Sequence, residues 1–173
     1  MEQQGYKEIS AKEIPDNVIH LIADDWMLVT SGDSSSFNTM TASWGGFGNI
    51  WNKPVAFIFI RPERYTYGFL ENNQSFTLSF FDHMKFKDDL MVCGTKSGRD
   101  GNKLVETSLT SMNLPEGYIA FSQARLIIAC KIIYRDKLSE DIIPEDVKNT
   151  FYKSGGFHEM FFGEITSVWI KNE

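Results

Sequence analysis

The sequence predicts a mainly β fold, a small antiparallel β-barrel with helical additions. Six segments have the composition or alternation of strands, whereas the candidate helices are short and scattered between them. The chain has 173 residues, a length typical of one domain that buries its own core without a disulfide or a metal. Its Gly/Ser-rich stretches are turn-sized, so no interdomain linker is expected.

The first predicted strands form a hairpin. Residues 26–31 (WMLVTS) are rich in strand-favouring side chains, and the Gly-Asp-Ser-Ser-Ser that follows indicates a turn into a second strand over residues 37–44. Residues 55–61 are apolar on both faces, which is typical of a strand covered on two sides.

Three more strands follow along the chain. Residues 75–81 alternate between apolar and hydroxyl side chains, which predicts a half-buried strand. Residues 126–134 are rich in isoleucine, and residues 160–170 carry large apolar groups on both faces, so both need distant partners. In the last strand the alternation places Phe162, Val168 and Ile170 on one face and Phe161, Ile165 and Trp169 on the other.

Four short helices are predicted between the strands. Thr66, Asp82 and Asp100 are candidate N-caps, and Gly94 is a natural end for the second helix. A proline opens the fourth, where its fixed φ is favourable. The predicted ranges are 66–72, 82–94, 100–105 and 144–152.

Charge and composition exclude several classes of protein. Lys plus Arg total 17 against 23 Asp plus Glu, a net charge of −6, and the pI is 5.1. A nucleic-acid surface needs a surplus of cations, so no such partner is expected. The N-terminus lacks the pattern of a secretory signal, and the longest apolar run, Val55–Ile60, is too short to cross a bilayer. We therefore expect a cytoplasmic protein without a membrane partner.

The two cysteines predict neither a metal site nor a redox pair. Cys93 and Cys130 lie 37 residues apart, without the close spacing of a zinc knuckle or a CxxC motif. We interpret both as reduced thiols in the core.

One predicted strand carries polar groups that suit a phosphate. In an extended chain Thr39, Thr41 and Ser43 share one face, opposite Met40 and its apolar neighbours. This arrangement predicts a ledge of three hydroxyls. The alternative is an amphipathic edge strand whose hydroxyls face water.

A second segment, Arg-Pro-Glu-Arg-Tyr-Thr, opens a predicted helix. Arg61 and Arg64 supply bidentate donors next to free backbone N–H groups, a combination that binds phosphate well. Alternatively, the two arginines pair with Glu63 and Glu71 at the surface.

Two later segments add further candidates. Residues 97–103 form a glycine-punctuated loop that places Lys103 at a helix start, which suits an anion, although such loops usually only connect elements. His158 lies at the start of the last strand, where a lone histidine is either a functional group or a hydrogen-bonded structural residue.

Taken together, these segments resemble the flavin reductase-like family, the FMN-binding split-barrel flavoproteins that include the flavoredoxins. The motifs recur in family order and cover most of residues 25–170, while residues 110–152 match no family motif. The matching stretches are Asn38-x-Met40-Thr41-Ala42-Ser43-Trp44, Arg61-Pro62-x-Arg64-Tyr65-Thr66, Phe76-Thr77-Leu78, Ser97-Gly98-Arg99-Asp100-x-x-Lys103 and His158-x-Met160-x-x-Gly163-Glu164-Ile165.

The resemblance implies an antiparallel split barrel of Greek-key type, with residues 1–173 as one flavin reductase-like domain. It further implies non-covalent FMN near a homodimer interface, and His158 close to the flavin as the candidate catalytic residue, contributed by either subunit. The implied cofactor-binding residues are Asn38, Thr39, Met40, Thr41, Ala42, Ser43, Trp44, Arg61, Arg64, Tyr65, Thr66, Ser97, Gly98 and Lys103.

The function implied is an FMN-dependent oxidoreductase that takes a hydride from NADH or NADPH and passes electrons to a small-molecule or protein acceptor. Such chemistry asks the protein mainly to bind and orient the flavin, which agrees with the absence of a recognisable Ser/His/Asp set in the sequence. Two alternatives stay open. One is a flavoredoxin-like electron carrier without its own nicotinamide site, and the other is a barrel that binds a different anionic or apolar ligand.

Overall fold

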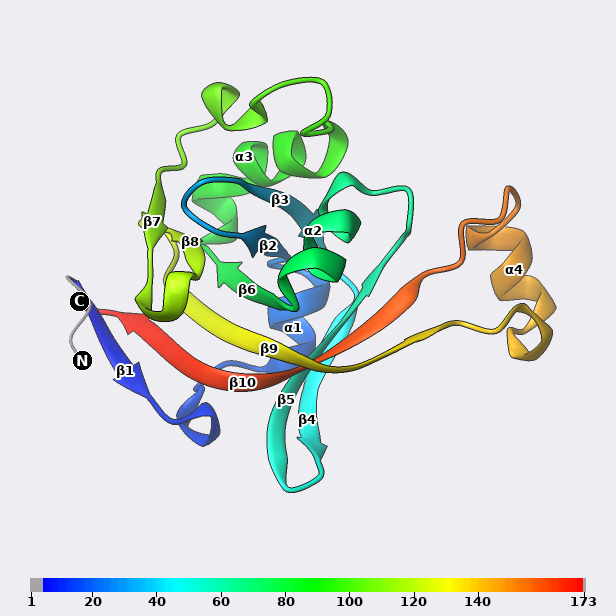
Figure 1. Cartoon of the computed structure of the whole chain (residues 1–173), viewed down its shortest axis with the longest axis horizontal. Coiled ribbons are helices and arrows are strands. Elements are labelled where there is room, and N and C mark those ends of the chain that lie inside the picture. Colours follow the sequence, from blue (N-terminus) through cyan, green and yellow to red (C-terminus); the bar gives the residue numbers. More distant parts are fainter. Residues whose placement is uncertain (1–4, 173) are drawn as a thin grey trace.

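The computed structural model describes residues 5–172 and confirms the predicted fold class: its main sheet is antiparallel throughout and curls into a split barrel (Figure 1). The strand order is β3-β2-β6-β9-β10-β5-β4, with β1 added beside β10. The strands are β1 (Tyr6–Ile9), β2 (Met27–Gly32), β3 (Phe37–Ala42), β4 (Gly45–Ile50), β5 (Lys53–Ile60), β6 (Ser75–Phe80), β7 (Ser111–Asn113), β8 (Ile119–Phe121), β9 (Leu126–Lys137) and β10 (Glu159–Lys171).

The helices lie in the connections between strands. None of those in residues 5–172 combines the length and apolar character that a membrane span requires. The α-helices are α1 (Val18–Ala23), α2 (Tyr65–Asn73), α3 (His83–Thr95) and α4 (Glu145–Phe151), and the 3-10 helices are η1 (Ala11–Glu13), η2 (Lys103–Glu106), η3 (Pro115–Gly117) and η4 (Glu140–Ile142).

Strand β6 shows the predicted alternation and one difference. Phe76, Leu78 and Phe80 point into the barrel interior, as the pattern predicts. The opposite face is buried too, because the Thr77 hydroxyl donates to the carbonyl of Ile119 in β8 at 2.6 Å. The short β7–β8 hairpin therefore covers a face that the sequence pattern assigns to solvent.

The predicted faces of β10 are wrong beyond its middle. The register of β10 against β9 shifts between Ile165 and Ser167, and an extra residue in one strand reverses the alternation that follows. Val168 consequently joins the same interior cluster as Phe161 and Ile165. A bulge of this kind has no sequence signal that alternation alone could detect.

Strand β4 is also missed by the sequence patterns, because its glycine-rich start is typical of a turn. Gly45 passes so close to β5 that a Cβ there would stand 2.3 Å from the carbonyl oxygen of Phe57. Glycine lets the chain turn from β3 into β4 at this point. The residues before it, Ser43 and Trp44, are left at an exposed kink.

The helix ends differ from the predicted caps in two places. Thr66 lies inside α2, whose N-cap is Arg64, and the side chain of Asn102, rather than Asp100, caps η2. Asp82 does stand at the N-cap of α3, although its side chain makes no capping hydrogen bond. Both cysteines are free and buried, as predicted.

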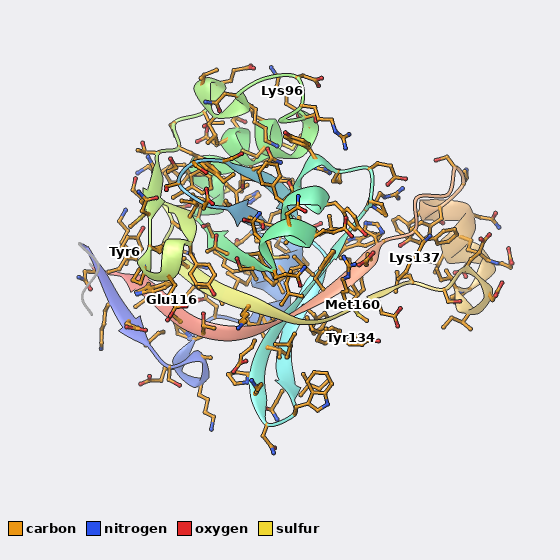
Figure 2. The ribbon with its side chains drawn as sticks, in the orientation of Figure 1. Tyr6, Lys96, Glu116, Tyr134, Lys137 and Met160 are labelled. Carbon is orange, nitrogen blue, oxygen red and sulfur yellow. The ribbon has the colours of Figure 1, made fainter. Side chains whose placement is uncertain are left out.

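A segment that we call the arm, residues 138–158, connects β9 to β10 and carries η4 and α4. Figure 1 shows it projecting away from the barrel at the end of these two long strands. The pair is in register at its base, where Lys137 faces Glu159. In Figure 2, Tyr134, Lys137 and Met160 lie along this pair on the side where the arm begins, whereas Lys96 lies at the top of the view, at the end of α3.

Candidate functional site

Two cations, the half-buried Arg64 and the buried Lys103, line one cavity of about 280 Å³ that we call the cation pocket. Arg64 stands at the start of α2, and Lys103 begins η2 after the loop that follows α3. The lining residues are Asn38, Met40, Glu63, Arg64, Tyr65, Thr66, Gly94, Thr95, Lys96, Ser97, Gly98, Arg99 and Lys103.

Lys103 is an unusual lysine because its side chain is only 6% exposed. Its Nζ donates to the carbonyl oxygens of Cys93 at 2.9 Å and Lys96 at 3.1 Å. Within residues 5–172 no carboxylate lies close enough to form an ion pair with it. The charge is therefore held by carbonyl dipoles alone.

Arg64 is held in the same way. Its Nη2 donates to the carbonyl of Gly94 at 3.1 Å, and the described part of the chain gives it no carboxylate partner. Burial lowers the pKa of both Arg64 and Lys103, and the Arg64 charge lowers the pKa of Lys103 further. A buried and a half-buried cation placed together without a paired counter-ion are costly, so the pocket is electrostatically suited to an anion.

The wall opposite the cations depends on Asn38 and Gly98. The Asn38 Nδ2 donates to the hydroxyl of Thr66 at 2.7 Å, which ties β3 to the first turn of α2. A Cβ on Gly98 would stand 2.1 Å from the Asn38 Oδ1 and 3.0 Å from the ring of Tyr65. Glycine at this position therefore keeps the amide in place and the cavity open.

The hydroxyls of β3 do not form the predicted ledge. Thr39 shares a hydrogen bond of 2.9 Å with the hydroxyl of Thr30, and the Thr41 hydroxyl donates to the carbonyl of Leu90 in α3. The side chains that β3 gives to the cation pocket are Asn38 and Met40, from the alternate face of the strand. The hydroxyl face of β3 instead packs against β2 and α3.

His158 lies at the base of the arm, against the kink that follows β3. Its ring centroid is 4.7 Å from that of Trp44, and its Nδ1 is hydrogen-bonded to the hydroxyl of Tyr152 at 2.8 Å. Burial, and then the positive charge of Arg61, lower the pKa of His158 to about 4. The imidazole is consequently neutral at pH 7.

Arg61 serves the arm rather than the cation pocket. Its Nη2 donates to the carbonyl of Phe151 at 2.6 Å, and its guanidinium lies over the ring of Tyr152 at 5.3 Å. Arg61 therefore contacts the arm, whereas Arg64 lines the cation pocket. No surface pairing of Arg61 or Arg64 with Glu63 or Glu71 is present; Glu71 pairs with Arg135 instead.

A second cavity of about 630 Å³, which we call the apolar pocket, lies beyond Trp44. Helix α1, the β3–β4 kink, β5 and the arm all contribute to it, and motif reading found only its Ser43 and Trp44. Its lining residues are Val18, Ile19, Ile22, Ala23, Ser43, Trp44, Gly45, Phe59, Leu138, Ser139, Ile142, Ile143, Pro144, Val147, Phe151 and Tyr152.

The sequence-predicted site residues thus fall into two groups joined by β3. One group lines the cation pocket, the other surrounds Trp44, and Asn38 and Ala42 are separated along the strand by roughly 13 Å at about 3.3 Å per residue. In the cation pocket are Asn38, Met40, Arg64, Tyr65, Thr66, Ser97, Gly98 and Lys103; Ser43 and Trp44 line the apolar pocket; Thr39, Thr41, Ala42, Arg61 and His158 line neither.

Comparison with known proteins gives a family match and a set of similar folds. The family model described as flavin reductase like domain matches residues 19–173. A search of curated proteins by sequence found no match.

Several solved structures share the fold at low sequence identity. An FMN-binding protein from Thermus thermophilus, solved with p-hydroxybenzaldehyde, has 19% identity and a TM-score of 0.68, covering 96% of this chain and 82% of that one. The flavoredoxin of Desulfovibrio vulgaris has 19% identity and a TM-score of 0.66, with coverages of 95% and 78%. An NADH:FAD oxidoreductase from Streptomyces globisporus has 16% identity and a TM-score of 0.61, with coverages of 83% and 74%.

Proposed function

This chain belongs to the flavin reductase-like family, and from that membership we propose that it binds FMN non-covalently and acts as an FMN-dependent oxidoreductase supplied with electrons by NADH or NADPH. The observation that carries the proposal is the cation pocket, where Lys103 is buried, Arg64 is half-buried, and neither cation pairs with a carboxylate among residues 5–172. A phosphate monoester supplies the missing charge.

The residues of the pocket fit the phosphate end of FMN. Arg64 and Lys103 would hold the phosphate by charge-assisted hydrogen bonds, together with backbone N–H groups at the start of α2. Ser97 and Gly98 would close the loop side, and Asn38 and Thr66 the strand side. Tyr65 lies at the rim with the Arg99 guanidinium 5.4 Å from its ring centroid.

The course of strand β3 indicates where the flavin ring would lie if the phosphate occupies the cation pocket. It leads from the cation pocket at Asn38 to the kink at Ser43 and Trp44, so a flavin with its phosphate at one end would bring its ring toward Trp44 and His158. Bound FMN supplies two-electron redox chemistry. His158 is then the candidate catalytic residue, and its neutral ring would offer a hydrogen bond to the flavin without adding a charge.

Titration of the apoprotein with FMN and with riboflavin tests the proposal. Riboflavin lacks only the phosphate, so we expect FMN to bind at least about tenfold more tightly at low ionic strength, since one charge-assisted contact contributes about 1.5–3 kcal/mol. Steady consumption of NADH or NADPH with an added acceptor tests the activity. Equal affinity for the two flavins would remove the phosphate assignment.

A flavoredoxin-like electron carrier is the second candidate, and one observation favours it. The apolar pocket beside Trp44 has no charged side chain in its lining, so nothing there pairs with the diphosphate of a nicotinamide dinucleotide. A carrier predicts negligible turnover of NADH and NADPH by the FMN-loaded protein, together with rapid reoxidation of the chemically reduced protein by a partner protein. The oxidoreductase predicts turnover without a partner.

We also propose a homodimer formed through the outer face of the barrel. An aromatic band crosses β5, β10 and β9 there: Phe57 stacks on Phe162 at 5.2 Å, and Tyr134 lies 6.0 Å from Phe162. Trp51 extends the band and is largely exposed. Apolar surface of this kind is typical of subunit contacts. Sedimentation of the wild type as a dimer and of Phe162→Lys as a monomer would support this surface, whereas a 19.8 kDa wild-type monomer would exclude it.

The match from residue 19 to residue 173 supports a single flavin reductase-like domain over residues 1–173. A cytoplasmic location without nucleic-acid or membrane partners stays a prediction from composition.

A further inference from the structure

The apolar pocket has the size and lining of a small-molecule site. Its volume of about 630 Å³ lies within the range of about 300–1,000 Å³ that is usual for ligand pockets. It is concave, and four separate segments build it, namely α1, the β3–β4 kink, β5 and the arm. Large apolar side chains are left exposed around it, with Ile19 at 75% and Ile142 at 82%.

The charge of the lining restricts what the pocket takes. None of its lining residues is an Asp, Glu, Lys or Arg. The nearby cation, Arg61, is turned toward the arm backbone and donates to the Phe151 carbonyl. An anionic ligand would lose part of its hydration here without gaining a counter-charge, which disfavours its binding. A neutral ligand has no such cost.

Its few polar groups suit a carbonyl compound. Ser43, half-buried, and Ser139, exposed, are two of the lining residues, and no hydrogen bond within residues 5–172 engages either hydroxyl. A hydroxyl donates readily to a carbonyl oxygen. Trp44 and Phe151 are perpendicular to each other at 5.3 Å and offer aromatic surface to a planar ring.

We propose that the apolar pocket binds an uncharged cyclic carbonyl compound of the quinone class, and that this compound is the electron acceptor of the chain. The second part rests on the proposed function; the binding itself does not. In the overall reaction the quinone takes up two electrons and two protons and becomes a hydroquinone, while NADH and one solvent proton supply them and NAD⁺ is released.

Binding is measured on the oxidised, FMN-loaded protein, since oxidised flavin does not reduce a quinone. The probes are 1,4-naphthoquinone and its 2-sulfonate, followed by calorimetry and by quenching of tryptophan fluorescence. We expect the neutral quinone to bind about tenfold or more tightly than the sulfonate, because the sulfonate carries a charge that the pocket cannot pair. Both cysteines are buried, which protects them from addition to the quinone.

Two variants of α4 locate the site. Val147 lines the pocket, whereas Asn149 is exposed on the same helix outside it. Val147→Asp should weaken naphthoquinone binding about tenfold or more, and the matched Asn149→Asp, with the same change in charge, should leave it unchanged. FMN affinity should be unchanged in both, which shows that the fold is intact.

Three outcomes would overturn the proposal. The first is equal binding of the two probes, and the second is unchanged quinone binding in Val147→Asp. The third is a wild-type protein that binds no quinone but forms a dimer that Val147→Asp disrupts. The last would assign the pocket to a second copy of the chain. If the protein fails to bind FMN and the apoprotein still binds the quinone with the expected response to the variants, the pocket assignment stands and the proposed function fails.

Discussion

The barrel and the arm are held in place in different ways. In β6 every residue from Phe76 to Phe80 is buried: Phe76, Leu78 and Phe80 belong to the interior cluster, and on the other face Thr77 bonds to β8. Across residues 138–158 only Tyr152 is buried. The arm is positioned instead by a few specific contacts: Arg61 with the Phe151 carbonyl, Tyr152 with His158, and the aromatic rings around Trp44. Burial of apolar side chains thus stabilises the barrel that carries the cation pocket, whereas a few side-chain contacts hold the arm in position.

The largest expected effect is on folding, from matched truncations in the two regions. Phe76→Ala in the barrel should lower the free energy of unfolding by about 3–5 kcal/mol, because it removes a fully buried ring. Phe151→Ala in the arm, where the ring is 48% exposed, should cost no more than about 1 kcal/mol. Urea denaturation measures both. Equal losses would mean that the arm belongs to the cooperative core, and the comparison would fail.

The second effect is on flavin affinity and isolates the barrel's contribution. Lys103→Met should lower FMN affinity about 10- to 100-fold, since a hydrogen bond to a charged group contributes about 1.5–3 kcal/mol. Riboflavin affinity should not change. The control Lys87→Met removes an exposed lysine of α3 and should leave both affinities as they are. A loss of riboflavin binding in Lys103→Met would show that the lysine supports the loop and not the phosphate.

A smaller, local effect should follow from releasing the arm. Arg61→Met removes the contacts with Phe151 and Tyr152, so amide hydrogen exchange in α4 should become about fivefold faster, the equivalent of about 1 kcal/mol, while barrel amides keep their protection. Lys153→Met, also in the arm, should change neither. If Arg61→Met weakened FMN binding as strongly as Lys103→Met, Arg61 would be a phosphate ligand, as the family resemblance implies.

A pH dependence is expected at the junction of the two regions. The pKa of His158 is about 4 in the folded protein, below its ordinary value of 6.5. Between these values the unfolded chain binds a proton that the folded chain does not, so stability falls as the pH is lowered from 6.5 toward 4. NMR titration of the imidazole should give a midpoint near 4, and His158→Gln should flatten the pH profile. A midpoint near 6.5 would contradict the buried position.

The sequence predicts the barrel better than it predicts the site. Strand β6 follows from local alternation, because the period of two is a property of the strand alone, and β2 follows from its strand-favouring residues and the turn after them. The bulge in β10 and the strand beginning at Gly45 do not, since each depends on how closely a neighbouring strand approaches.

Within the site, Arg64 and Lys103 come together as the motifs predict. The hydroxyls of Thr39 and Thr41 do not reach that cavity, because α3 and β2 compete for them. Alternation identifies which side chains share a face, but not which element covers it.

The apolar pocket lies beyond sequence reasoning for a related reason. Much of its wall comes from α1 and from residues 138–152, about 120 residues apart in the chain, and neither stretch has a motif. A signal was nevertheless present: Ile142 and Ile143 before Pro144, and Val147 and Phe151 after it, are apolar residues without a strand partner to bury them.

The base of the arm also has a consequence for how the molecule can change. Lys137 and Glu159 are paired across two neighbouring strands, so the barrel needs only these two positions to stay adjacent. Closing a longer or shorter connection between fixed ends changes the entropy cost slowly, by about 0.6 kcal/mol for each doubling of length. Residues 138–157 can therefore change in length and side chains, and the ligand preference of the apolar pocket with them, while Arg64 and Lys103 keep their positions.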